Sequence, residues 1–301
     1  MKRASPQAGL GIALIVLMTW CFATMDSAIR WLGAFLPVLL ILWSRYLTQA
    51  VVMLVWLGLR ARRQGSLRGF AVAHPRFQLL RGSLLLATSG INFWGVQHMP
   101  VGEYTAINML SPVIVTLLAG MVLQERVTAL RWALVLGGFA GALVMIRPGS
   151  GSFGWEVLAP LAGACTYACF QVLTAKLSGL DDPYTTHLYT GATGALLLLP
   201  VVCFYAEPLL AALQGASAVQ LGWMLAIGLL GTLGHLLLIL ALRLASTATL
   251  MPFIYVQIGA AALIGLLAFD HHPDAMSWLG MGIISACGAA SVWLNVRRTQ
   301  R

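Results

Sequence analysis

Residues 221–242 read LGWMLAIGLLGTLGHLLLILAL, a run of 22 residues without Asp, Glu, Lys or Arg. A helix that crosses the hydrocarbon core of a bilayer needs about 20 mostly apolar residues. In lipid, each backbone N–H and C=O needs a partner within the protein, and a helix supplies these partners within one segment. The run therefore predicts a membrane-spanning helix.

Similar apolar runs lie on both sides of residues 221–242, separated by short segments that carry Pro, Gly and charged residues. The sequence predicts an all-α integral membrane protein with ten transmembrane helices. These are Gly9–Ile29, Val38–Leu59, Phe77–Gln97, Val101–Leu123, Trp132–Ile146, Trp155–Ala175, Thr185–Ala206, Leu221–Leu242, Ser246–Phe269 and Ser277–Val296. The connections are short except Arg60–Arg76 and Glu207–Gln220, so there is no room for a soluble domain.

The composition agrees with a lipid environment. Hydrophobic residues make up 59% of the 301 residues and charged residues only 9%, whereas soluble domains average about 25% charged residues. The net charge of +9 does not indicate a nucleic-acid partner, because the charges gather between apolar runs. The five cysteines lie inside apolar runs without zinc-type spacing, so we expect no metal, disulfide or cofactor.

The basic residues predict the orientation, because cytoplasmic loops are enriched in Lys and Arg. With ten spans, one set of loops holds fifteen basic residues and the other holds only Arg30 and Arg147, while Arg45 lies within a span. The fifteen are Lys2, Arg3, Arg60, Arg62, Arg63, Arg68, Arg76, Arg81, Arg126, Arg131, Lys176, Arg243, Arg297, Arg298 and Arg301. We therefore expect both termini on the cytoplasmic side of the inner membrane.

The two halves of the chain share a pattern. An offset of 145 aligns Gly120 with Gly265 and Glu125 with Asp270, and a Pro opens the second span of each half, at Pro37 and Pro183. The predicted repeats are residues 1–148 and 149–301. Because each has five spans, an odd number, the halves must be inverted relative to each other, as in many alternating-access transporters.

The segments that connect and end the spans resemble a known family. MPVGEYTA at 99–106, SPV at 111–113 and LQERVT at 123–128 are followed in the second half by ALRLASTA at 241–248 and AFD at 268–270. This pattern resembles the EamA domain of the drug/metabolite transporter superfamily, repeated twice. Two departures are Asp270 in place of the usual Glu, and Pro252, five residues before the position that matches Pro112.

The resemblance implies export or exchange of small metabolites. Members similar to the YddG-type exporters move amino acids, and others move nucleosides, sugars, riboflavin or S-adenosylmethionine. We therefore expect a secondary transporter that exports small metabolites, most of all amino acids. The alternative is an importer or exchanger of a heteroaromatic metabolite of the riboflavin, S-adenosylmethionine or nucleoside type.

Arg45 and Gln49 are polar residues four positions apart inside the second predicted span, so they share a helix face. Polar groups at membrane depth are costly and usually functional. Arg45 is predicted either to hold a substrate carboxylate or to form a structural pair with Asp26 or with backbone carbonyls. Asp26 is predicted either to pair with Arg30, four residues on, or to serve as a coupling or gate residue.

Further polar side chains inside the spans predict a central cavity for a zwitterionic or heteroaromatic solute, although each alone also suits helix–helix contact. The predicted substrate-binding residues beside Arg45 and Gln49 are Asn92, Tyr104, Asn108, Tyr167, Gln171, His187, His235, Tyr255 and Gln257. The glycines at 137 and 141, and at 228, 231 and 234, predict close helix packing within the chain. The sequence contains no Walker A motif and no catalytic constellation, so we expect neither ATP drive in this chain nor enzyme activity, and a functional monomer.

Overall fold

The computed structural model describes residues 6–98, 108, 110–122, 128–147, 155, 158–269 and 274–299, and its regular elements are all helical. The first half contains α1 (Pro6–Leu32), α2 (Val38–Gln64), η1 (Leu67–Phe70), α3 (Pro75–His98), α5 (Ser111–Val122) and α6 (Ala129–Ile146). The second half contains α7 (Leu158–Leu177), α8 (Pro183–Phe204), α9 (Ala206–Gln214), α10 (Ala218–Leu244), α11 (Thr247–Leu250), η3 (Met251–Tyr255), α12 (Val256–Phe269) and α13 (Ala275–Thr299).

Six helical stretches in the described residues are long and apolar enough to cross a membrane. They are Gln7–Leu32, Val38–Gln64, Leu158–Leu177, Pro183–Phe204, Ala218–Leu244 and Met251–Ala268. Shorter apolar helical stretches lie at Ser111–Val122, Trp132–Gly141 and Trp278–Cys287. The helical membrane architecture is therefore as expected, while the count of ten spans stays a prediction.

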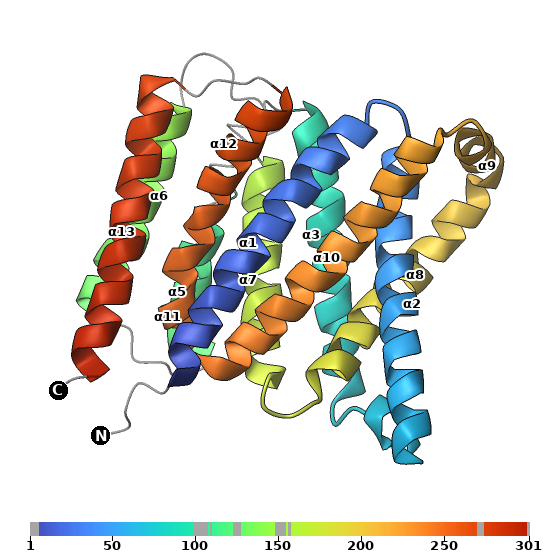
Figure 1. The fold of residues 1–301 in the computed structure, drawn as a ribbon, viewed down its shortest axis with the longest axis horizontal. Helices are drawn as coiled ribbons and strands as arrows, with labels where there is room; N and C mark the ends of the chain where they lie inside the picture. The colour runs from blue at the N-terminus through green and yellow to red at the C-terminus, as the bar shows by residue number, and fades with distance from the viewer. Residues whose placement is uncertain are drawn as a thin grey trace.

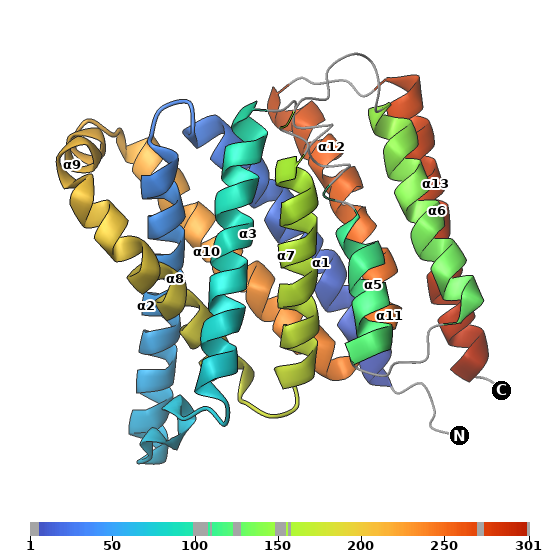
Figure 2. The same ribbon diagram turned by 180° about the vertical axis from the view of Figure 1, so that it is seen from behind.

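The long helices form two layers. Figure 1 shows α13, α12, α1 and α10 side by side in one layer, and Figure 2 shows α6, α5, α7 and α3 side by side in the other. Helices α2 and α8 pack together at one end of the molecule, and α6 and α13 pack together at the other. Within the layers, α1 packs on α10 and α12, and α7 packs on α3 and α5.

The outer surface of the helices is apolar, as a lipid environment requires. Large hydrophobic side chains are exposed in mid-helix, among them Leu54 at 55%, Leu196 at 66% and Leu267 at 78%. Soluble monomers rarely expose contiguous apolar surface on this scale. Several polar side chains in the spans are buried instead, among them Arg45, Gln49 and His187.

Two predicted segments differ from the structure. The predicted span Ser246–Phe269 is not one continuous α-helix, because α11 gives way to the 3₁₀ helix η3 around Pro252 before α12 begins. Proline has no backbone N–H to donate and its ring clashes with the preceding turn, which explains a break at this point. The predicted connection Glu207–Gln220 contains the short helix α9.

Glycines allow the closest contacts between helices. A Cβ added at Gly82 of α3 would lie 2.6 Å from Cβ of Thr193 on α8, and one added at Gly228 of α10 would lie 2.6 Å from Cβ of Thr48 on α2. Gly231 approaches the Arg45 side chain and Gly234 approaches the Phe22 ring. The predicted glycine stripe of α10 therefore packs inside the chain, on α1 and α2.

Helix α1 begins and α13 ends on the same face of the molecule (Figure 1). The end of α2, with Arg60, Arg62 and Arg63, and the end of α7, with Lys176, lie at that face as well. The predicted charge distribution was wrong for Arg81, because its side chain is fully buried within the helices and does not lie in a loop.

Candidate functional site

Arg45 is the centre of a buried polar cluster in the middle of the helices. It lies seven residues into α2, about 10 Å along the helix axis, and is only 2% exposed. Its Nη2 donates to Oγ of Ser89 on α3 at 2.9 Å, and its Nη1 lies 3.4 Å from Nε2 of His235 on α10. The guanidinium also stacks over the ring of Tyr46, 4.4 Å from the ring centroid. Arg45 thus links α2, α3 and α10.

Aromatic rings surround His235 on two sides. The ring of Phe22 from α1 lies 4.7 Å from it in a tilted arrangement, and the ring of Phe170 from α7 lies 5.8 Å from it, edge to face. Tyr167 stacks on Phe170 with ring centroids 5.9 Å apart. Arranged in this way, rings from α1, α7 and α10 offer the flat apolar faces that stack on planar ligands.

Gln49 and His187 form a second buried pair next to Arg45, between α2 and α8. Nε2 of Gln49 lies 3.2 Å from Nδ1 of His187 and donates to the backbone carbonyl of the same residue at 3.0 Å. Because an amide nitrogen only donates, Nδ1 accepts in this arrangement and Nε2 carries the imidazole proton. The pair fixes the orientation of a histidine that is fully buried.

A second buried arginine, Arg81 on α3, lies against the ring of Phe170. Its Nε donates to Oγ1 of Thr174 at 2.7 Å, and its Nη1 donates to Oγ1 of Thr190 and, at 3.1 Å, to the carbonyl of Thr186. The guanidinium carbon is 4.9 Å from the centroid of the Phe170 ring. Phe170 therefore contacts both Arg81 and His235.

Asp26 of α1 contacts Gln257 of α12, whose Nε2 donates to Oδ2 of Asp26 at 3.1 Å. Within the described residues, Asp26 forms no ion pair with Arg30 or Arg45, so neither predicted structural pair is present. Asp26 is nonetheless within electrostatic range of Arg45 and Tyr167. The side chain of Asp26 is exposed rather than enclosed between helices. Its coupling role stays a prediction.

No metal centre accompanies this cluster. Among the residues that the structure describes, there is no group of three or more His, Cys, Asp and Glu side chains that could hold a metal ion. The cluster around Arg45 combines a guanidinium, an amide, hydroxyls, histidines and aromatic rings, which are groups that bind polar organic molecules.

Comparison with known proteins identifies the family. Residues 9–147 match the EamA-like transporter family. A riboflavin transporter of Vibrio cholerae is 30% identical over 230 residues, which cover 75% of this chain and 74% of that protein. The chain belongs to the EamA-like transporter family. This family is part of the drug/metabolite transporter superfamily.

Other relatives of this EamA transporter carry different substrate names. A riboflavin transporter of Rhizobium johnstonii is 29% identical over 72% of this chain and 71% of its own length. An S-adenosylmethionine uptake transporter of Rickettsia prowazekii is 23% identical over 91% of this chain and 89% of its own length. A pseudopaline exporter of Pseudomonas aeruginosa is 26% identical over 93% of this chain and 95% of its own length.

A solved crystal structure shares the fold of this EamA transporter. The two superpose with a TM-score of 0.76 at 17% identity, over 98% of this chain and 99% of the other. At this identity the likeness concerns the fold alone. It agrees with the all-helical architecture that the sequence predicts.

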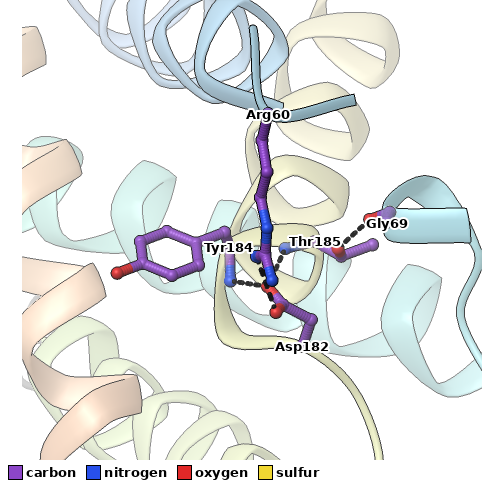
Figure 3. A network of polar contacts seen from close by, with 5 residues as sticks. All are labelled: Arg60, Gly69, Asp182, Tyr184 and Thr185. Carbon is purple, nitrogen blue, oxygen red and sulfur yellow. Dashed lines mark hydrogen bonds and ion pairs between the residues drawn. The ribbon is translucent and has the colours of Figure 1, made fainter. Parts of the chain in front are cut away.

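A polar network joins the two halves of the transporter at the face that holds its termini (Figure 3). Asp182 accepts from the N–H groups of Tyr184 and Thr185, which caps α8, and its Oδ2 lies 3.0 Å from Nη1 of Arg60 at the end of α2. The hydroxyl of Thr185 donates to the carbonyl of Gly69. The start of α8 is thereby tied both to α2 and to η1.

The preceding residue, Asp181, continues this network below the surface. Its Oδ1 accepts from the N–H of Ala73 at 2.7 Å, and its Oδ2 accepts from Nε2 of Gln78 on α3 at 2.7 Å. Asp181 is only 8% exposed. We call Asp181 and Asp182 with these partners the α7–α8 latch.

The structure brings many of the predicted site residues together. Arg45, Gln49, Tyr167, His187 and His235 lie in or beside the central cluster, Gln171 is buried on α7, and Gln257 contacts Asp26. Asn92 and Asn108 are half-buried, and Tyr104 lies outside the described residues.

Tyr255 is placed elsewhere in the EamA transporter. It is buried where η3 packs on α6, with its hydroxyl donating to the carbonyl of Val135 and its ring against Gly138. The predictions did not include Arg81, Phe22 or Phe170. Arg81 had a detectable signal, since it lies inside the predicted span Phe77–Gln97, whereas an aromatic residue in an apolar run carries none.

Proposed function

We propose that the chain is a secondary transporter that takes up a heteroaromatic metabolite of the riboflavin type across the cytoplasmic membrane. The observation that carries the proposal is the central cluster, where Arg45 and His235 lie among the rings of Phe22 and Phe170. Stacking faces next to a fixed cation and a histidine suit a planar, hydrogen-bonding ring system.

The printed names of relatives support the same substrate class. Riboflavin transporters from two bacteria match at 29% and 30% identity, and S-adenosylmethionine uptake transporters match over most of the chain. None of these names supports amino-acid export, the substrate and direction that the sequence favoured. One relative is named as a pseudopaline exporter, so the printed names do not agree on the direction of transport, which the uptake experiment tests.

We infer further that transport uses two inverted repeats, residues 1–148 and 149–301. Exchanging the halves, with α1 for α7, α2 for α8, α3 for α10, α5 for α12 and α6 for α13, turns each major packing pair into another observed pair. Thus α1 with α10 becomes α7 with α3, and α1 with α12 becomes α7 with α5. The pairs α2 with α8 and α6 with α13 map onto themselves, as pairs on a two-fold axis would.

Equivalent connections on opposite faces support the inversion. The α1–α2 connection, before Pro37, lies on the face away from the termini, and the α7–α8 connection, before Pro183, lies on the same face as the termini (Figure 1). A substrate site between inverted repeats is the usual arrangement for alternating access. The central cluster draws its residues from both proposed repeats, as such a site requires.

Uptake into proteoliposomes tests the proposed function. Vesicles that contain the full chain should accumulate labelled riboflavin above protein-free vesicles, in a saturable way, and should not accumulate labelled amino acids. Parallel samples with S-adenosylmethionine test the second heteroaromatic substrate. Movement of amino acids without riboflavin would overturn the proposed substrate. If none of these compounds moved, riboflavin, S-adenosylmethionine and amino acids would all be excluded as substrates.

A further inference from the structure

Arg81 is a buried cation without a carboxylate among its contacts. Its three hydrogen bonds go to the hydroxyls of Thr174 and Thr190 and to the carbonyl of Thr186, and its fourth neighbour is the Phe170 ring. Its side chain is fully buried. A charge at this depth is costly unless an opposite charge or a full set of hydrogen bonds compensates it.

The neighbouring charged groups do not provide that compensation. Asp181 accepts hydrogen bonds from the N–H of Ala73 and from the amide of Gln78, and it forms no hydrogen bond with Arg81. Asp26 contacts Gln257 and lies in range of Arg45. The groups that contact Arg81 from α8 are the hydroxyl of Thr190 and the carbonyl of Thr186. The buried charged side chains among the described residues are two arginines, Arg45 and Arg81, and one carboxylate, Asp181.

Arg81 on α3 and Gln171 on α7 both carry buried polar atoms without a partner. Its Nη2 has no hydrogen-bond partner, and neither does either amide atom of Gln171, whose side chain is fully buried. Gln171 precedes Thr174, the residue that binds Nε of Arg81, by three positions, so the two share one face of α7. Leaving a buried polar atom without a partner costs about 1–3 kcal/mol, so three such atoms on two helices that pack together, α3 and α7, point to a ligand.

We propose that Arg81 and Gln171 form a subsite for the anionic group of an aromatic substrate, a carboxylate or a phosphate. The free Nη2 of Arg81 would donate to an anionic oxygen, the Gln171 amide would donate to a second oxygen, and the Phe170 ring would lie against the aromatic part. This subsite is separate from the contacts of Arg45 with Ser89 and His235. Within the proposed riboflavin-type class, it predicts a preference for compounds that carry a negative charge over their neutral counterparts.

The inference rests on the proposed function, because an anion reaches this depth only if the protein admits substrate. Its test measures binding, so that the two can fail separately. The full chain in lipid nanodiscs is titrated with two matched pairs, flavin mononucleotide against riboflavin and indole-3-acetate against indole-3-acetamide. In at least one pair, the acid should bind about tenfold more tightly than its neutral partner, the ratio that one charge-assisted hydrogen bond provides.

Variants assign the preference to the subsite. Gln171→Leu replaces a buried amide without partners by an apolar side chain of similar size, so the fold should stay intact while the preference for the acid falls. Arg81→Gln should abolish the preference and Arg81→Lys should reduce it, because an ammonium lacks the planar fork of a guanidinium. Arg60→Gln, which removes the same charge from the membrane surface, is the matched control and should change nothing.

The outcomes separate the two proposals. Equal binding of acid and neutral compound in both pairs, no binding of either acid, or an unchanged preference in Gln171→Leu would each overturn the subsite. If the indole acid is preferred and the variants act as expected but riboflavin is not taken up, the subsite stands and the riboflavin proposal fails. If riboflavin is taken up without any preference for an acid, the transport proposal stands and the subsite fails.

Discussion

Ser89 and His235 contact the same guanidinium group, that of Arg45, from α3 and α10. The two residues are 146 positions apart, the same spacing as Pro37 and Pro183, so they occupy equivalent places in the proposed repeats. The residue equivalent to Arg45 itself is Gly191, and the space beside it is filled by Gln49 and Ala50. A single arginine thus bridges both proposed repeats, and the cluster around it is asymmetric although the helices are arranged symmetrically.

This position makes Arg45 sensitive to conservative replacement. Arg45→Lys keeps the charge but loses the fork that reaches Ser89 and His235 together. We expect the initial rate of riboflavin uptake to fall by about tenfold or more, since a buried charge-assisted hydrogen bond contributes about 1.5–3 kcal/mol. Arg60→Lys, at the surface, should stay within about twofold of the unmodified chain. Uptake by Arg45→Lys at the unmodified rate would show that the bridge is dispensable.

The role of Arg45 in binding is separable from a role in folding. If Arg45 holds an anionic part of the substrate, Arg45→Lys should weaken transport of a carboxylate more than transport of its decarboxylated analogue. A structural arginine predicts equal losses for both compounds, together with a lower melting temperature. Rates and melting temperatures measured on the same preparations distinguish these results.

Gly82 and Gly228 are also 146 positions apart, and each faces a threonine of a neighbouring helix. Gly82→Ala and Gly228→Ala should each destabilise the protein by about 1–3 kcal/mol, the usual cost of overpacking a tight contact. Gly58→Ala and Gly222→Ala are matched controls on α2 and α10, where an added Cβ meets nothing within 4 Å. They should be neutral or stabilising by up to about 1 kcal/mol, because Ala favours helix. Unfolding in a detergent of graded strength measures all four, and equal effects would refute the tight contacts.

The sequence predicted the polar centre of the site better than its walls. Arg45, Gln49, His187 and His235 stood out because polar groups are rare in apolar runs, and the structure buries all four. Phe22 and Phe170 could not stand out, because an aromatic ring in an apolar run is compatible with packing on lipid, on a helix or on a ligand. Arg81 was detectable in principle, but its place near a span end suggested a loop.

Helix periodicity predicts on which face of a helix a residue lies, but it does not predict which neighbouring helix contacts that face. For this reason Tyr255 was grouped with the site, although it packs on α6 with Val135 and Gly138. The break at Pro252 follows from local chemistry and could have been predicted from the residue itself. Which helices become neighbours depends on long-range packing, and the sequence of a single span does not show which helix it will pack against.

The α7–α8 latch gives a prediction that depends on burial. Asp181→Ala should destabilise the protein by about 1–3 kcal/mol, because it removes the acceptor of the Ala73 N–H and one of the two acceptors of the Gln78 amide below the surface. Asp182→Ala should cost about 1 kcal/mol, mostly from the lost cap of α8, since its ion pair with Arg60 is partly exposed. Chemical unfolding of both variants checks the order, and a larger loss for Asp182→Ala would contradict it.

The charge distribution predicts which face is cytoplasmic. Gly179, between α7 and α8, lies on the face with the termini and the basic ends of α2 and α7, and Gly215, between α9 and α10, lies on the opposite face (Figure 1). In a background without the native cysteines, Gly215→Cys should react with a membrane-impermeant thiol reagent in intact cells. Gly179→Cys should react only in inside-out vesicles or after permeabilisation.

The labelling result decides the orientation because these two glycines are separated by two helices, α8 and α9, of which α8 is long enough to cross the bilayer. Both positions are exposed, so a difference in reactivity reports the side of the membrane rather than burial. Riboflavin uptake by each variant serves as the control for folding. The reverse pattern, with Gly179→Cys labelled in intact cells, would place basic residues such as Arg60, Arg62, Arg63, Arg76, Lys176 and Arg243 outside, against the rule that basic loops stay in the cytoplasm.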